Sequence, residues 1–243
     1  MINSVRNTVL SILNKNNYGY ISPSDFNLFA KQAQLDIFEN YFFDYNYQIN
    51  KENARQSGTG YADLKQNDEE VIDSFSVTSN LTVVAATNTF TLPSDWYLLN
   101  SIFYDAQAAP AVPLRQMERV SQKKIRLLLN SNITSPNTLY PAYTMEANLL
   151  TAYPITINTQ GDVVCQYIRY PKDPKWTYVD VPTATGEPLF DSTAADYQDF
   201  EIPVSDEPTL VVRILEYAGL SIREGDVVKV ASSMDNREAA SEK

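Results

Sequence analysis

The chain has 243 residues, of which 44% are hydrophobic and 20% are charged, which is ordinary for a globular protein. Its 30 acidic residues outnumber 19 lysines and arginines, and the net charge of −11 argues against a surface that grips duplex DNA through its phosphates. The sequence contains no histidine, which excludes Ser-His-Asp, Cys-His and histidine-metal sites within the chain. Most hydrolase mechanisms are thereby disfavoured.

The single cysteine, Cys165, cannot form an internal disulfide, and its alternating context predicts a buried strand residue in a reducing compartment. No apolar run reaches the ~18 residues that a membrane-spanning helix needs. Residues 1–12 also lack the apolar core of a signal peptide. We therefore expect a protein without a membrane anchor that is made without export.

Two helices are expected at the start of the chain. Residues 1–13 have helical apolar spacing, and residues 16–19 supply residues that stop a helix. Ser22 then offers an N-cap and Pro23 a first helical residue. No Gly or Pro interrupts residues 24–57, so a second helix reaching Gln56 would be about 50 Å long at 1.5 Å per residue.

This long helix has two apolar faces. At 100° per residue, one face gathers Phe26, Phe29, Ala33, Ile37 and Tyr41, and the other gathers Leu28, Leu35, Phe38, Phe42 and Ile49. A soluble helix normally buries a single stripe, so the second face predicts a neighbouring subunit or another layer. The candidate interface residues on this helix are Phe38, Phe42, Phe43 and Tyr47.

Near Val77 the residue composition changes, and β-branched and aromatic residues, which favour strands, become frequent. The expected strands are residues 89–92, 97–104, 140–145, 149–153 and 162–170, which predict a small antiparallel sheet. Ala147 and Asn148 must form a tight turn between two of them, where Asn tolerates a left-handed backbone. Residues 113–130 interrupt the strands as an expected amphipathic helix.

That expected helix carries the one basic concentration of the chain. Its positive residues are Arg115, Arg119, Lys123, Lys124 and Arg126, against Glu118 alone. The simpler interpretation is a solvated polar face on a packed helix. The sharper one is a docking surface, with Arg119, Lys123 and Lys124 contacting an acidic neighbour such as the acidic loop of an adjacent copy.

The acidic loop is expected over residues 176–203, which hold six acids and no Lys or Arg: Asp180, Glu187, Asp191, Asp196, Asp199 and Glu201. A helix should follow, capped by Ser205 and ended by Gly225. The remaining tail places Val227, Val230 and Met234 on a narrow apolar stripe. That tail is interpreted either as a frayed terminus or as an arm awaiting a partner.

The expected fold class is α+β. N- and C-terminal helices, in residues 1–75 and 205–243, would form a helical bundle with a C-terminal arm. A central β-rich module of residues 76–204 would be joined to it.

No motif in the sequence predicts a cofactor or a metal. The glycines at Gly58 and Gly60 fit neither a P-loop nor a dinucleotide fingerprint. Two alternatives stay open: a carbohydrate-binding or fibre-associated module that uses Trp96 and Trp176, and a carboxylate hydrolase that uses acids such as Asp196 and Glu201.

Three blocks of the chain resemble the head-to-tail adaptor, or tail tubular protein A, family of short-tailed bacteriophages. They are residues 91–99 (TLPSDWYLL), residues 140–171 with strands ending in Tyr153-Pro154 and Tyr170-Pro171, and residues 210–221 with Tyr217-Ala-Gly. Residues 16–46 look like ring or connector proteins of crAss-like and related marine phages. Together these blocks cover about two thirds of the chain.

The resemblance implies a non-enzymatic virion subunit, assembled in the host cytoplasm, without a cofactor. It implies a ring of twelve identical copies between the portal protein and further tail ring or tail tube proteins. DNA would pass through the ring without specific binding, and Val227, Val230 and Met234 would dock on the portal or on a neighbouring ring.

Overall fold

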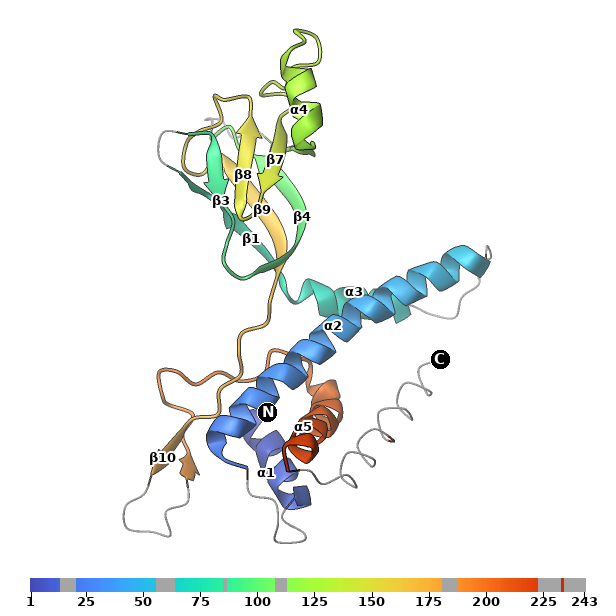
Figure 1. Ribbon diagram of the computed structural model, residues 1–243, viewed down its shortest axis with the longest axis vertical. Helices are drawn as coiled ribbons and strands as arrows, with labels where there is room; N and C mark the ends of the chain where they lie inside the picture. Colours follow the sequence, from blue (N-terminus) through green and yellow to red (C-terminus); the bar gives the residue numbers. More distant parts are fainter. Residues whose placement is uncertain are drawn as a thin grey trace. The chain divides into compact units, whose positions relative to one another are not determined.

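The computed structural model describes residues 1–13, 21–55, 64–84, 87–107, 113–180 and 188–222, together with Ser233. Helices and strands both form in this part of the chain, so the protein has the mixed α and β structure that the sequence predicts (Figure 1). The chain divides into two compact units. We call residues 1–71 with 171–243 the helical unit, and residues 72–170 the β unit.

Three helices supply most of the helical unit's core: α1 (Ile2–Leu13), α2 (Pro23–Arg55) and α5 (Glu207–Ile222). Helix α5 packs against both α1 and α2. The core they share buries side chains from all three, among them Val5, Val9, Phe26, Ala33, Ile37, Leu210 and Ile214. The predictions for α1 and α2 are confirmed to within one residue at each end.

The start of α2 follows the capping chemistry that the sequence indicates. Ser22 Oγ accepts a hydrogen bond from the backbone N–H of Asp25 at 3.1 Å and donates one to the Asp25 carboxylate at 2.7 Å. These bonds satisfy a backbone donor that has no partner within the helix. The predicted cap at Ser205 is wrong, because Val204–Asp206 form a short 3₁₀ turn (η2) and α5 begins at Glu207.

The boundary between the units differs from the one the sequence favours. Residues 171–204 belong to the helical unit, not to a β-rich module of residues 76–204. The reason is apolar burial, since Trp176, Phe200 and Ile202 pack into the same core as the three helices. This segment is also not a loop throughout, because β10 (Tyr178–Asp180) and β11 (Pro188–Phe190) pair in it as an antiparallel hairpin. One more helix, α3 (Leu64–Asp73), lies where the chain leaves the first part of the helical unit.

The described strands of the β unit form two sheets. The first has the order β1 (Ser76–Asn80), β9 (Val163–Arg169), β4 (Trp96–Tyr104) and β5 (Arg115–Gln116). The second has the order β2 (Thr82–Val83), β3 (Thr89–Thr91), β8 (Leu149–Tyr153), β7 (Ala142–Glu146) and β6 (Glu118–Arg119). Strands β6 and β7 run parallel, so the expectation of one purely antiparallel sheet is corrected to two sheets, the second of them mixed.

Both sheets contribute to one apolar core. Ile102 and Cys165 come from the first sheet, and Phe90 and Leu150 come from the second. Cys165 is fully buried on β9, as the sequence predicts, and burial raises the pKa of its thiol to about 12. The cysteine is therefore a packing residue that stays protonated near neutral pH.

The β7–β8 hairpin turns at the two residues that the sequence indicates. Glu146 pairs with Leu149 across the turn, and the positive φ of 49° falls at Ala147 rather than at Asn148. Asn148 contributes differently, because its side-chain oxygen accepts a hydrogen bond from Trp96 Nε1 at 2.7 Å. The turn is thus fixed to β4 of the other sheet.

Residues 113–130 do not form one helix. The first part is taken by β5 and β6, and only α4 (Gln122–Leu129) is helical, with Ser121 as its N-cap. The backbone N–H of Val120 donates to Tyr143 O at 2.9 Å, which ties this segment to β7. The helical spacing of the sequence is overridden by strand pairing that only the tertiary fold supplies.

Candidate subunit interface

Helix α2 carries four of the aromatic side chains that the sequence singles out. Phe38 is 0% exposed, so the chain itself covers it and a neighbouring subunit cannot contact it. Phe42 is half-buried and packs its ring edge-on against Phe38, with centroids 5.1 Å apart. Phe43 and Tyr47 are 68% and 43% exposed. On the predicted second face, Leu28 is exposed, Leu35, Phe42 and Ile49 are half-buried, and Phe38 is buried. Phe43 and Tyr47 lie at other angles around the helix, so their exposure is a separate feature.

The basic residues lie on three elements rather than on one helix, with Arg115 on β5. Arg119 is on β6, and Lys123 and Lys124 are on α4, and all three are exposed. Helix α4 buries Ile125 in a small cluster with Val120 and Ala142. Its cations consequently face solvent, and Lys124 Nζ lies 3.9 Å from the Glu118 carboxylate.

The charge of the chain is divided unequally between the two units. Residues 72–170 contain six acids and six bases, so the net charge of −11 lies entirely on the helical unit, with 24 acids and 13 bases. Residues 119–145 hold four bases and no acid. A basic end of the β unit and an acidic helical unit are complementary in sign.

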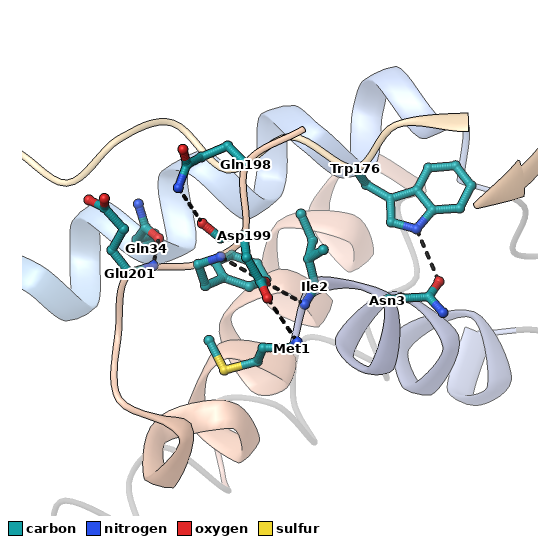
Figure 2. Close-up of polar contacts among 9 residues, drawn as sticks. Met1, Ile2, Asn3, Gln34, Trp176, Gln198, Asp199 and Glu201 are labelled. Atoms are coloured by element: carbon teal, nitrogen blue, oxygen red, sulfur yellow. Dashed lines mark hydrogen bonds and ion pairs between the residues drawn. The ribbon is translucent and has the colours of Figure 1, made fainter. Parts of the chain in front are cut away.

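Four acids of residues 176–203 have side chains that the structure describes, and each has a partner within the helical unit: Asp191, Asp196, Asp199 and Glu201. The Asp199 carboxylate accepts hydrogen bonds from the Met1 amino group at 3.0 Å, from the Ile2 N–H at 2.7 Å and from the Phe200 N–H at 2.9 Å (Figure 2). Burial opposes the charged form of this carboxylate. The ammonium and the N–H donors outweigh burial and hold the pKa of Asp199 below its usual value.

A second set of polar contacts lies beside Asp199. The Gln34 side-chain oxygen accepts from the Glu201 N–H at 3.1 Å (Figure 2), and Gln34 Nε2 donates to Lys172 O at 2.8 Å. Trp176 Nε1 donates to Asn3 Oδ1 at 3.1 Å. These contacts connect α1, α2 and the segment before α5, so their role is to hold the helical unit together. The described carboxylates of the acidic segment are thus already bonded within the chain.

The two acids that the hydrolase alternative would use, Asp196 and Glu201, each bind a different group of the chain. Asp196 pairs with Lys175, whose hydrogen bond lowers the pKa of this exposed carboxylate, while Glu201 accepts from the Lys172 N–H at 2.8 Å. A general acid needs a raised pKa, so the structure does not favour this reaction. Among the described residues, no group of three His, Cys, Asp or Glu side chains could hold a metal ion.

The two tryptophans that the carbohydrate-binding alternative would use do not present fully exposed ring faces to solvent. Trp176 is 2% exposed, and the Arg6 guanidinium lies 3.8 Å from the centre of its ring. Trp96 is half-buried and bound to Asn148. Stacking on a sugar ring would require an exposed aromatic face, which Trp176 does not present.

Sequence reasoning missed two surface features. One is the tip of the β unit, which we define as residues 127–140 and which exposes Leu127, Ile133, Leu139 and Tyr140. The other is an apolar groove of about 710 Å³ between α1 and α5, lined chiefly by Ile12, Val204, Val211, Val212 and Leu215. A signal for the tip is present in the three successive leucines 127–129, since an eight-residue helix with one buried face cannot cover all of them.

Comparison with known proteins gives no match to any family model and no significantly similar curated protein. In the part of the chain that the structure describes, no helix combines the length and apolar character that crossing a bilayer requires. The tail residues Val227, Val230 and Met234 lie outside the described residues. Their predicted docking role therefore remains a prediction.

Proposed function

We propose that this chain is a non-enzymatic structural subunit of a phage virion, forming a ring that connects the portal to the tail and extends the DNA channel. In this proposal α1, α2 and α5 form a helical bundle that builds the ring wall, and twelve copies close the ring. The portal protein and a further tail ring or tail tube protein are its neighbours, and assembly takes place in the host cytoplasm.

The observation that carries the proposal is the pair of exposed aromatic side chains on α2. Phe43 and Tyr47 have 68% and 43% of their surface exposed, on a helix whose Phe26, Ala33 and Ile37 are buried in the unit's own core. Exposed aromatic residues on an otherwise well-packed helix are typical of surfaces that bury against another protein. The family resemblance supplies the identity of that protein as a second copy.

The charge distribution supports a channel function. Strong binding to DNA depends on many Lys and Arg contacts that release counterions, and the helical unit has far more acids than bases. A channel wall of this charge repels phosphates and lets DNA slide. The absence of His in the sequence also removes the commonest general base.

Electron microscopy of the purified chain, alone and with portal protein, tests the proposal directly. We expect rings in at least one of these samples, and monomers in both would overturn it. The variant Phe43→Asp should abolish rings, because a carboxylate would be buried at the contact. The matched control Gln32→Glu adds the same charge at an exposed position of α2 about three helical turns away and should leave rings intact.

The tail is tested separately. Truncation after Ile222 removes Val227, Val230 and Met234, and we expect the truncated subunit to form rings that no longer bind the portal or a neighbouring ring. Particle assembly that proceeds normally with this truncation would contradict the docking role of the tail.

A further inference from the structure

We propose that the tip of the β unit of one copy inserts into the groove between α1 and α5 of a second copy. This inference rests on the proposed function, because it specifies a second contact between neighbouring subunits of the ring, in addition to the one made by α2. It is argued from the exposure and rigidity of the tip, the apolar character of the groove and the charges around both.

The tip presents large apolar side chains to solvent. Ile133 is 95% exposed, Tyr140 78% and Leu127 67%. These three side chains come from α4 and from the segment that follows it, within fourteen residues of the chain. Contiguous exposed apolar side chains of this kind mark a surface that is buried in an assembly.

Hydrogen bonds hold the tip in one conformation. The Asn137 side-chain oxygen accepts from the N–H groups of Leu139 at 2.8 Å and Tyr140 at 2.9 Å. Arg115 Nη1 donates to Thr138 O at 2.5 Å. Because the loop is already ordered, binding through it loses little conformational entropy.

The groove is the counterpart on the helical unit. Val204 is 73% exposed at the start of η2, and Ile12 is 42% exposed on α1. Val211 and Leu215 of α5 form the floor together with these residues. The groove volume of about 710 Å³ exceeds that of a single isoleucine side chain, so Ile133 can enter it with a neighbour from the tip.

The charges around the two surfaces favour a second copy as the partner. Lys123, Lys124 and Arg126 are exposed on α4, beside the tip. Glu207 lines the groove, in the unit that carries the whole net charge of −11. Two different patches on one chain that fit each other form a head-to-tail contact, which closes into a ring when the rotation between copies closes.

Cross-linking between two differently tagged full-length chains tests the contact. One chain carries Ile133→Cys, the other carries Val204→Cys, and a short bismaleimide is added to the mixture. We expect a cross-link between the two chains, while the buried Cys165 stays unmodified. The control is Ile155→Cys, at a 72% exposed position in the same unit, which should not cross-link to Val204→Cys. Equal cross-linking from Ile155 would overturn the inference.

Sedimentation of full-length variants measures the energetic weight of the tip. Ile133→Asp should weaken self-association about tenfold or more, as loss of a central apolar contact does, while Ile155→Asp should leave it unchanged. Lys123→Glu with Lys124→Glu should also weaken it at low salt, and adding Glu207→Lys should restore part of the loss.

The outcomes separate this inference from the proposed function. Rings that persist unchanged with Ile133→Asp would overturn the tip and groove contact and leave the ring proposal standing. Monomers of the unmodified chain in both microscopy samples and sedimentation would overturn both. A cross-link within one chain between Val204→Cys and a second introduced thiol in the tail, Val227→Cys, would show that the tail fills the groove, and would also overturn the inference.

Discussion

Different kinds of contact stabilise the interior of the helical unit and the interior of the β unit. In the helical unit, side chains far apart in the sequence join through hydrogen bonds to carboxylates, as Tyr41 does with Asp206 and Tyr217 with Asp36. In the β unit, pairing runs chiefly from strand to strand through the main chain around an apolar core, although Tyr167 also donates to the Asp95 carboxylate at 3.2 Å. The difference teaches that the stability of the helical unit depends on protonation, whereas that of the β unit depends chiefly on packing.

Removal of the Trp176 side chain should give the largest difference between the units. Trp176 is buried among residues of the helical core, so Trp176→Ala should lower the free energy of unfolding of the helical unit by about 3–5 kcal/mol. Circular dichroism in the helical band reports this loss, and fluorescence of Trp96, the one tryptophan that remains, reports on the β unit.

The exposed neighbour Val179 provides the control for that substitution. Val179→Ala, at a 51% exposed position, should change stability little. Equal loss of the Trp96 signal in Trp176→Ala would show that the two units unfold as one, and would break the comparison.

Removal of the Asp199 carboxylate should have the next largest effect. Asp199→Ala leaves the Ile2 and Phe200 N–H groups without their acceptor and should cost about 1–3 kcal/mol of helical-unit stability. Glu39→Gln, at an exposed position of α2, is the matched control and should change little.

Acid titration tests the contribution of the Asp199 carboxylate to the stability of the helical unit. Because the pKa of Asp199 is lowered on folding, its contribution is fully present above the unfolded-state value of about 4 and is lost as the pH falls below it. The helical circular dichroism signal should therefore fall in acid before the Trp96 fluorescence does, measured in a Trp176→Phe background so that Trp96 is the one tryptophan. Asp199→Asn should reduce that pH dependence, and an unchanged acid transition in this variant would contradict the assignment.

Alkaline titration should give a smaller effect. Burial and the hydrogen bond to Asp36 raise the pKa of Tyr217 to about 12, and burial with the bond to Asp206 raises that of Tyr41. Their contributions are fully present below the unfolded-state value of about 10 and are lost as the pH rises above it. Tyr217→Phe should cost about 1 kcal/mol at neutral pH and flatten the alkaline loss, measured by chemical denaturation at several pH values.

The smallest expected effect is a gain in the β unit. Ala147 holds a left-handed backbone that costs a non-glycine residue about 1–2 kcal/mol, so Ala147→Gly should raise stability by up to about 1 kcal/mol after the larger chain entropy of glycine is subtracted. The Trp96 transition measures it. Ala152→Gly, in the middle of β8, should be destabilising and serves as the contrast.

Local patterns predicted α1, α2 and the β7–β8 hairpin because their signals lie within a few adjacent residues. Strand β1 was missed because Ser76–Asn80 offers only Val77 as an apolar residue, and its place is set by pairing with β9. The helix expected at residues 113–130 failed for the same reason, since β6 is defined by its pairing with β7.

The candidate interface was predicted to a similar extent. The sequence singled out both Phe38 and Phe43 as interface candidates on α2, but burial depends on what the rest of the chain covers, and the two residues end at 0% and 68% exposure. The groove could not be predicted at all, because Ile12 and Val211 are brought together only when the first and last described helices pack.

The order in which residues enter each core bears on synthesis at the ribosome. The β unit uses the continuous stretch 72–170, whereas the helical core needs both Ile2 and Ala218. During translation the β unit can complete its sheets while α1 and α2 still lack α5. The apolar face of α2 that α5 covers is thus exposed until late in chain elongation. A nascent chain truncated before residue 207 is therefore expected to aggregate or to recruit chaperones.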